Sequence, residues 1–280
     1  MQWSSGDRDN IEDRRGSGGR GIVPVGIGAV LVLGLLSLVT GRNFLSLLDT
    51  GQSGAPSSGT GEVQSTPQEE RKVDFVDAVA RDVQATFGQA LGPRYERTVV
   101  VLFRDAVDSA CGSAQSATGP FYCPGDQKVY LDLGFFDELT QRFGAPGEFA
   151  QAYVVGHEIG HHVQHLLGLD ARTRGGAIGE NSASVALELQ ADCLAGIWGH
   201  DASQGGRFTA GRVELEPGDA EEALRAASAI GDDRLQKMAT GHVMPDRFTH
   251  GTSAQRVQAF QRGMSSGDFG ACGIGSRAAR

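Results

Sequence analysis

The sequence predicts an α+β domain with a predominantly helical body and a small sheet, preceded by one transmembrane helix. Three observations carry this prediction. Long segments of residues 69–280 show the apolar spacing of helices. Two shorter stretches, residues 97–107 and the one that begins at Lys128, are apolar and rich in β-branched residues, which is typical of strands. Residues 21–41, GIVPVGIGAVLVLGLLSLVTG, contain no charged side chain.

The uncharged stretch 21–41 has the length of a membrane span. A helix that rises 1.5 Å per residue covers about 30 Å over such a stretch, which is the thickness of a bilayer core. A buried core helix is the alternative, but apolar residues on every side of so long a run disfavour it. A cleaved signal peptide is a second alternative, and the following sequence LVTGRNF lacks a small-x-small cleavage site.

Flanking charges predict the orientation of this span. Only Arg42 follows it closely, whereas four arginines precede it: Arg8, Arg14, Arg15 and Arg20. The positive-inside rule therefore predicts a single-pass protein whose residues 1–20 form a cytoplasmic tail and whose remaining chain is exported.

The segment after the span predicts a tether and one folded domain. Residues 42–68 are rich in glycine, serine, threonine and proline, above all in 50–68, and such a composition is typical of a flexible linker. The remaining 69–280 are long enough for a single core. The net charge of −9 and the lack of a basic stripe with interleaved aromatics exclude nucleic acid as an expected partner. The oligomeric state has no signature in the sequence.

Four cysteines agree with export. An even number of cysteines in an exported domain predicts disulfides, and no pair has the C-x-x-C spacing of a cysteine-ligated zinc site. Of the three possible connectivities the simplest pairs neighbours in sequence, Cys111 with Cys123 and Cys193 with Cys272.

The expected elements place the chemistry on helices. The pattern predicts a strand over 97–107 and a second one in KVYLDL from Lys128. The expected helices are 73–91, 135–143, 148–168, 182–200, 219–230, 232–240 and 253–263. The fourth, with Ser182 or Ser184 near its start, contains the segment ELQAD, and the third contains HEIGHHVQH.

The third helix carries four histidines within nine residues. His157 and His161 are four residues apart and therefore lie on one face, where both imidazoles reach one tetrahedral metal. Glu158 lies beside them and is free to act as general base, as in the H-E-x-x-H motif of zinc hydrolases. His162 lies about 100° further round the helix, and His165 lies further along it, so neither is expected to bind this metal.

The third ligand is expected from the next helix. Glu188 and Asp192 are four residues apart in an apolar surrounding, VALELQADCLAGIW, where unpaired carboxylates are costly. Glu188 as ligand gives a His2Glu zinc site, and Asp192 then accepts the outer N–H of a bound histidine. The alternative is that both acids lie on a solvated helix face.

HEIGH and ELQAD together resemble the gluzincin type of zinc peptidase. Several blocks resemble more closely the bacterial family of putative neutral zinc metallopeptidases, and they cover almost the whole chain: NIEDRRG, CGSAQSATGPFYCPGDQKVYLDLGFF, GHEIGHHVQHLLG, ELQADCLAGIWGH and FTHGTSAQRVQAF. The resemblance implies a zincin-like fold, a zinc-dependent peptidase and a peptide or protein substrate. With the span, it implies a bacterial membrane protein whose catalytic domain lies outside the cytoplasm.

The expected mechanism combines Zn2+ as Lewis acid with Glu158 as general base. His250 is the candidate donor to the developing oxyanion, with Tyr153 and His242 as further candidates, although His250 also suits a surface position before the last helix. Resemblance to zincins implies in addition that KVYLDL binds substrate by strand addition. Two other functions stay open: a zinc-stabilised scaffold without catalysis and a zinc amidase of the cell wall.

Overall fold

The computed structural model describes residues 1–16, 63–173, 178–205 and 213–275. The α-helices are α3 Pro67–Leu91, α4 Gly134–Gln141, α5 Glu148–Leu166, α6 Ala183–Ser203, α7 Asp219–Ala229, α8 Asp232–Thr240 and α9 Ser253–Ser266. The strands are β1 Gln2–Trp3, β2 Ile11–Asp13, β3 Val99–Phe103, β4 Ala106–Ser109, β5 Gly112–Gln115, β6 Phe121–Cys123, β7 Lys128–Asp132 and β8 Val213–Glu214. The mixture of many helices with small sheets is the α+β class that the sequence predicts.

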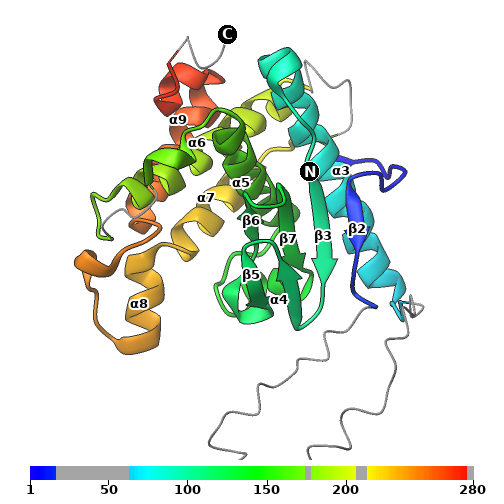
Figure 1. Cartoon of the computed structure of the whole chain (residues 1–280), viewed down its shortest axis with the longest axis horizontal. Helices are drawn as coiled ribbons and strands as arrows, with labels where there is room; N and C mark the ends of the chain where they lie inside the picture. The colour runs from blue at the N-terminus through cyan, green and yellow to red at the C-terminus, as the bar shows by residue number, and fades with distance from the viewer. Residues whose placement is uncertain (17–62, 174–177, 206–212, 276–280) are drawn as a thin grey trace, which may run out of the picture.

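A four-stranded sheet forms one side of the molecule (Figure 1). Its order is β2-β3-β7-β6, in which β2, β3 and β7 run parallel and β6 runs antiparallel at the edge. Both faces of the sheet are covered, which explains why the sequence of β3, VVVLF, is apolar without alternation. Val100 and Leu102 face the helical core, while Val101 and Phe103 face a second cluster under the β4–β5 hairpin.

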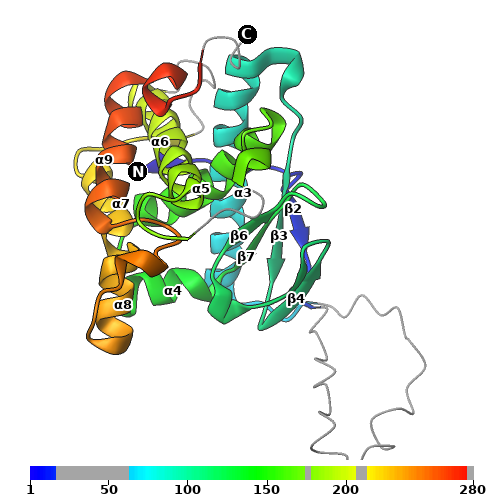
Figure 2. The ribbon, with the colours of Figure 1, turned by 60° about the vertical axis from the view of Figure 1, so that its left-hand side comes forward.

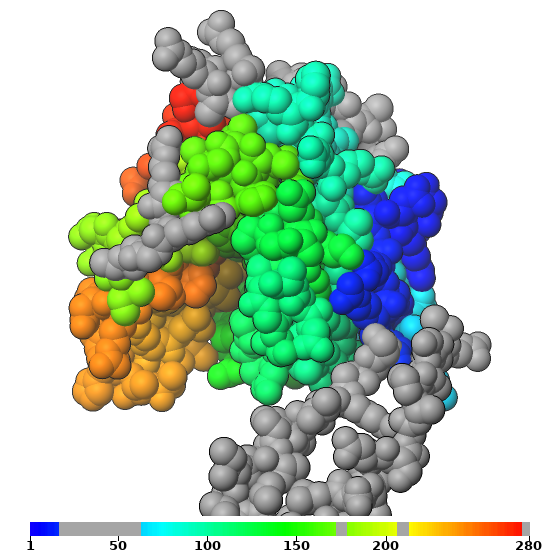
Figure 3. All heavy atoms as spheres, in the orientation of Figure 1, coloured from blue at the N-terminus to red at the C-terminus, as the bar shows by residue number. Residues whose placement is uncertain are grey.

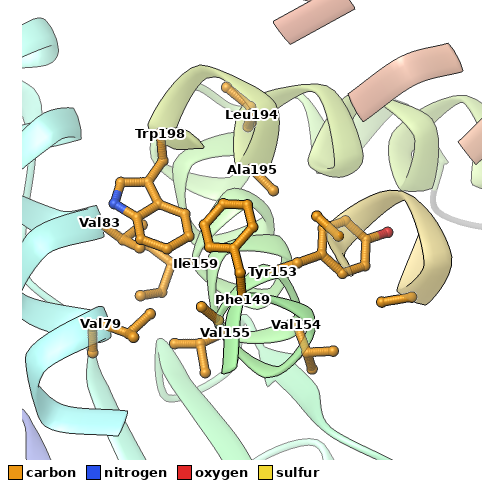
Figure 4. Packing of buried hydrophobic residues seen from close by; sticks show 14 of the residues in the cluster. Val79, Val83, Phe149, Tyr153, Val154, Val155, Ile159, Leu194, Ala195 and Trp198 are labelled. Carbon is orange, nitrogen blue, oxygen red and sulfur yellow. The ribbon is translucent and has the colours of Figure 1, made fainter. Parts of the chain in front are cut away.

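The helices form two further layers, with α5 between the sheet and helices α6, α7 and α9 (Figures 1 and 2). Figure 4 shows the packing around α5, where Phe149 lies against Trp198 of α6 with ring centroids 5.5 Å apart. Val79 and Val83 of α3 cover the other side of this cluster. Because α5 is buried on nearly every side, its position is fixed before any ligand binds.

Side chains and glycines set the helix ends near the site. Ser182 begins α6, because its Oγ accepts the Val185 N–H at 3.2 Å. Thr252 and Gln255 form a capping box at the start of α9. Gly168 follows α5 with a φ of 68°, a conformation that favours glycine.

Two expectations about the strands are wrong. The stretch 97–107 is not one strand, because the chain turns at Asp105, whose φ is 63°, between β3 and β4. The first five residues of KVYLDL form β7, which pairs with β3 on one side and with β6 on the other and thus has no free edge for a substrate strand. The free edge on this side of the described sheet belongs to β6.

The first sixteen residues lie in the body of the domain, whereas the sequence predicted a separate tail over 1–20. Strand β1 pairs with β8, and β2 pairs with β3. The partner of β1 lies about 210 residues away along the chain and that of β2 about 90, so no local pattern indicates the pairing. No helix in the described part of the chain is long and apolar enough to cross a membrane, and the predicted span 21–41 lies outside that part.

The disulfides connect the expected cysteines. Cys111 pairs with Cys123 and fastens the β4–β5 hairpin to the edge strand β6. Cys193 pairs with Cys272 and joins α6 to the C-terminal part of the domain. The simplest of the three connectivities is therefore confirmed.

Candidate active site

Helices α5 and α6 approach each other closely at the predicted metal ligands. Gly160 makes this possible, because a Cβ at this position would lie 3.1 Å from the carbonyl oxygen and 3.2 Å from the Cα of Ala191. The same contact brings Glu188, less than one turn before Ala191, opposite the histidines of α5. The second x of the H-E-x-x-H motif thus has a packing role.

The structure brings His157, His161 and Glu188 into one group whose ligand atoms lie within 4.8 Å of one another. The two Nε2 atoms are 3.2 Å apart. The carboxylate of Glu188 lies 3.2 Å from Nε2 of His157 and 3.5 Å from Nε2 of His161. Tetrahedral zinc with ligand bonds of about 2.0–2.1 Å separates its ligand atoms by about 3.3 Å, so this donor set fits the ion.

The hydrogen bonds of the two Nδ1 atoms explain why the Nε2 atoms of His157 and His161 attract a cation. Nδ1 of His157 lies 2.8 Å from Asp192 Oδ1, and Nδ1 of His161 lies 2.9 Å from Gln164 Oε1. Both partners are acceptors, since the amide nitrogen of Gln164 donates to the Leu187 carbonyl at 2.7 Å. When both imidazoles are neutral, the protons are therefore on Nδ1, and two Nε2 lone pairs and a carboxylate face one another.

Asp192 belongs to a buried cluster that orients His157. Arg256 of α9 donates to both carboxylate oxygens, at 2.9 Å from Nε and 2.8 Å from Nη2, and Tyr153 donates to the same carboxylate. Burial alone would raise the pKa of Asp192, but the charges of Arg256 and His157 lower it below its usual range. The carboxylate therefore stays ionised and holds the His157 ring in one orientation.

The carboxylates also change the pKa values of the two histidines. Burial alone would lower the pKa of His157, but Asp192 and Glu188 raise it to about 10. Burial opposes protonation of His161 as well, and Glu188 raises its pKa above the ordinary value. In the metal-free protein at neutral pH the site therefore holds protons that a divalent cation must displace.

Glu158 faces a cavity that opens beside the three ligands. The cavity has a volume of about 610 Å³, and Figure 3 shows its hollow between the segment around α8 and the strands of the sheet. Glu158 is 8% exposed and has no hydrogen-bond donor among the described residues. The edge strand β6 also lines the cavity, through Phe121 and Tyr122. A water molecule and a peptide thus have access to the ligand group.

His162 and His165 have other partners, as the helix geometry predicted. His162 is buried, its Nε2 donates to the Glu96 carbonyl at 2.6 Å, and its Nδ1 lies 3.0 Å from the Tyr122 hydroxyl. His165 lies 2.8 Å from Asp170. His162 therefore fastens β6 to α5, and neither histidine points to the ligand group.

The three candidate oxyanion donors lie in different surroundings. His250 lines the cavity with its side chain 49% exposed, and its Nδ1 lies 3.3 Å from Asp232. Tyr153 is fully buried, and its hydroxyl already donates to Asp192. His242 is exposed and does not line the cavity. Of the three, His250 is the one whose side chain can reach a bound peptide.

A sequence model of the family described as putative neutral zinc metallopeptidase matches residues 1–274. The chain belongs to this family. "Uncharacterized protein YpfJ" of Escherichia coli (strain K12) is 43% identical over 290 residues, which cover 97% of this chain and 98% of that protein. "Uncharacterized protein Rv2575" of Mycobacterium tuberculosis (strain ATCC 25618 / H37Rv) is 42% identical over 230 residues, 80% of this chain and 78% of that protein. No solved structure matches the chain.

Membership in this metallopeptidase family makes zinc the expected ion for the ligand group. Sequence reasoning missed two residues that support the ligands, Arg256 and Gln164. Gln164 follows His161 by three positions and lies on the same helix face, so its contact had a local signal. Arg256 lies 64 residues after Asp192. The sequence indicated only that a buried Asp192 needs a cationic partner, and not which residue supplies it.

Proposed function

We propose that this protein is a zinc-dependent peptidase that cleaves peptide bonds with Glu158 as general base. One observation carries the proposal: the group of His157, His161 and Glu188 opens onto a cavity lined by Glu158, whose carboxylate accepts no hydrogen bond from the described residues. A metal that only stabilises a fold is enclosed by its ligands and needs neither a cavity nor a free base. Family membership supports the same conclusion.

His157, His161 and Glu188 would hold the ion, and Asp192 and Gln164 keep the imidazoles in the binding tautomer. A bound zinc ion supplies Lewis-acid chemistry, which lowers the pKa of water and polarises a carbonyl. Glu158 accepts a proton from the attacking water and delivers it to the leaving amine. His250 is the proposed donor to the oxyanion, where one such hydrogen bond contributes about 3–4 kcal/mol.

The edge strand β6 is the proposed platform for substrate. An extended peptide that adds to β6 would run along the cavity, and its main-chain groups would pair with those of the strand. Tyr122 at the centre of β6 is held by His162 of α5, which fixes the distance from the strand to the ligand helix. Phe135, Leu187 and Leu235 also line the cavity, so we propose a preference for apolar side chains near the cleaved bond.

We further propose that the peptidase works outside the cytoplasm and is attached to the bacterial membrane through residues 21–41. Two disulfides in one domain support an oxidising compartment. The length and apolar character of 21–41 support attachment to a bilayer.

The decisive experiment compares the full wild-type chain with Glu158→Gln for zinc content and for cleavage of a peptide library. We expect one zinc ion per chain in both, and a loss of cleavage by at least a factor of 100 in the variant. Glu138→Gln is the matched control, because Glu138 lines the same cavity from α4. If wild type and Glu158→Gln bind zinc and neither cuts any peptide, the proposal is wrong and the scaffold function is favoured. Cleavage of cell-wall fragments instead of peptides would favour the amidase.

A further inference from the structure

Residues 1–16 are built into the catalytic domain along their length. Trp3 of β1 pairs with Val213 of β8. Its ring packs edge-to-face on Phe75 of α3, with ring centroids 5.5 Å apart, and its indole N–H donates to the Glu148 carboxylate at 3.2 Å. Strand β2 extends the main sheet beside β3. Hydrogen bonds of 2.8 Å from Val100 N to the Asn10 carbonyl and from Arg14 N to the Leu102 carbonyl continue this ladder at both ends.

Asn10 connects this segment to polar groups that are themselves buried. It is 1% exposed, and its side-chain amide donates to Asp77 at 3.0 Å and accepts from Gln84 at 2.9 Å. Asp77 has 0% of its surface exposed, and Arg81 is its other partner. Without residues 1–16 the Asp77 carboxylate would lose two hydrogen bonds in a place where water is excluded, which is costly.

Two arginines fasten the segment to the first turns of α3. Arg8 lies 2.7 Å from Asp74 and 2.6 Å from Glu70. Arg15, whose side chain is 1% exposed, lies 2.9 Å from Glu70 and 3.1 Å from Glu69. These pairs lie between segments more than 50 residues apart in the sequence.

The same contacts place the two ends of the stretch 17–62 next to each other. Nη1 of Arg15 lies 3.2 Å from Oγ of Ser65. Figures 1 and 2 show that β2 ends and α3 begins at the same end of the molecule. The stretch between them contains a single apolar run of spanning length, 21–41, because the remainder carries Arg42 and Asp49 and is rich in glycine and serine.

A single crossing of the bilayer between residues 16 and 63 would separate two parts of the chain that pack together in the domain. It would leave residues 1–16 on one side and 63–280 on the other, and β2 would then be absent from the sheet. We propose that residues 1–16 and the catalytic domain lie on the same side of the membrane to which the chain is attached. The domain is thus attached to the lipid surface at the point where β2 ends and α3 begins.

Ion pairs within the domain explain why the arginines before the apolar run predicted that residues 1–20 and the domain lie on opposite sides of the membrane. The positive-inside rule counts arginines that are free to remain in the cytoplasm. Of the four that precede the apolar run, Arg8 and Arg15 form ion pairs with carboxylates of α3, and Arg14 pairs with Glu12. These charges have a structural role in the domain. The inference concerns membrane topology, so it holds or fails independently of the peptidase activity.

Sided labelling of the full chain tests the proposal. Ser5 and Ser265 are both exposed, one before the apolar run and one on α9, so Ser5→Cys and Ser265→Cys are matched variants. A maleimide that cannot cross membranes is applied to right-side-out and inverted vesicles of the expressing bacterium. We expect both cysteines to react strongly in one kind of vesicle and at least tenfold less in the other. Labelling from opposite sides would overturn the proposal, and recovery of the chain in the soluble fraction would overturn the membrane attachment.

A charge exchange tests whether the segment packs on the domain in the full-length protein. Arg8→Asp and Asp74→Arg each place like charges together, and we expect each to lower the melting temperature by about 2–4 °C. The double variant restores an ion pair between positions 8 and 74 while Glu70 still faces position 8, so it should recover part of the loss. Additive losses without recovery would show that Arg8 and Asp74 do not meet, and the proposal would then fail whatever the labelling pattern.

Discussion

Replacement of Arg256 by methionine tests the buried cluster behind the predicted metal ligands. The arginine is 2% exposed and donates to both oxygens of Asp192, to the Tyr153 oxygen at 3.2 Å and to the Ile230 carbonyl at 3.2 Å. Methionine fills much of the volume but leaves a buried carboxylate without its cation. Loss of one partner from a buried ion pair costs about 3–5 kcal/mol. For a domain of this size the melting temperature should fall by about 6–20 °C.

The same change should weaken metal binding, although Arg256 is not a ligand. Asp192 orients His157, and loss of such an orienting contact typically lowers metal affinity about 10–100-fold. Competition with a chromophoric zinc chelator measures the affinity, and scanning calorimetry with and without zinc measures the stability.

Two comparisons make this prediction refutable. Arg262→Met on the exposed side of the same helix is the control and should leave both quantities unchanged. Asp192→Asn combined with Arg256→Met removes the unpaired charge and should recover part of the stability but not the zinc affinity. If Arg256→Met alone binds zinc and unfolds as wild type does, the reasoning about the cluster is refuted.

Three further predictions concern the ligand helices and the pH. Gly160→Val should push α5 from Ala191, with at least tenfold weaker zinc binding by chelator competition. Cys193→Ser with Cys272→Ser opens a loop of 79 residues and should cost about 4 kcal/mol in denaturant unfolding. Zinc binding at pH 7 should release protons, because the pKa of His157 is raised from 6.5 to about 10. This protonation stabilises the metal-free fold fully below pH 6.5 and progressively less up to about pH 10. Calorimetry in buffers of different ionisation enthalpy should show a nearly constant proton release from His157 that falls only as the pH approaches about 10.

The ligand group could be predicted from the sequence because its geometry is local. His157 and His161 share a helix face by their spacing alone, and Glu188 and Asp192 do the same on the next helix. That the two faces meet depends on the packing of α5 on α6, for which Gly160 gives a hint but no proof. The structure brings the predicted ligands together through this packing.

The parts that sequence reasoning missed depend on contacts between distant segments. KVYLDL has the alternation of a strand, but alternation does not tell whether a strand lies at an edge or between two neighbours. The three residues of β6 are too few to show any period. Arg256 lies in a polar stretch of α9, where an arginine is ordinarily exposed, and its buried partners, Asp192 foremost, lie on other elements.

The N-terminal segment illustrates the same limit. Its glycines and charges suit a tail by composition, and an edge strand of three residues is below the length at which a pattern indicates a strand. NIEDRRG contains Asn10 and Arg15, whose contacts lie on α3. Composition describes how a segment behaves alone, whereas these residues are ordered by partners that the sequence does not identify.

The contact between Arg256 and Asp192 also has a consequence for folding during synthesis on the ribosome, because the two residues are made at different times. All three predicted metal ligands are synthesised by residue 188, and Asp192 follows four residues later. The guanidinium that neutralises Asp192 comes 64 residues after it, and the disulfide partner of Cys193 comes 79 residues after that cysteine. A nascent chain that ends after α6 therefore has every ligand but not the cation that keeps the orienting carboxylate in place. Tight binding of a metal ion by these three residues is therefore expected only at the end of synthesis, when nearly the whole domain has emerged.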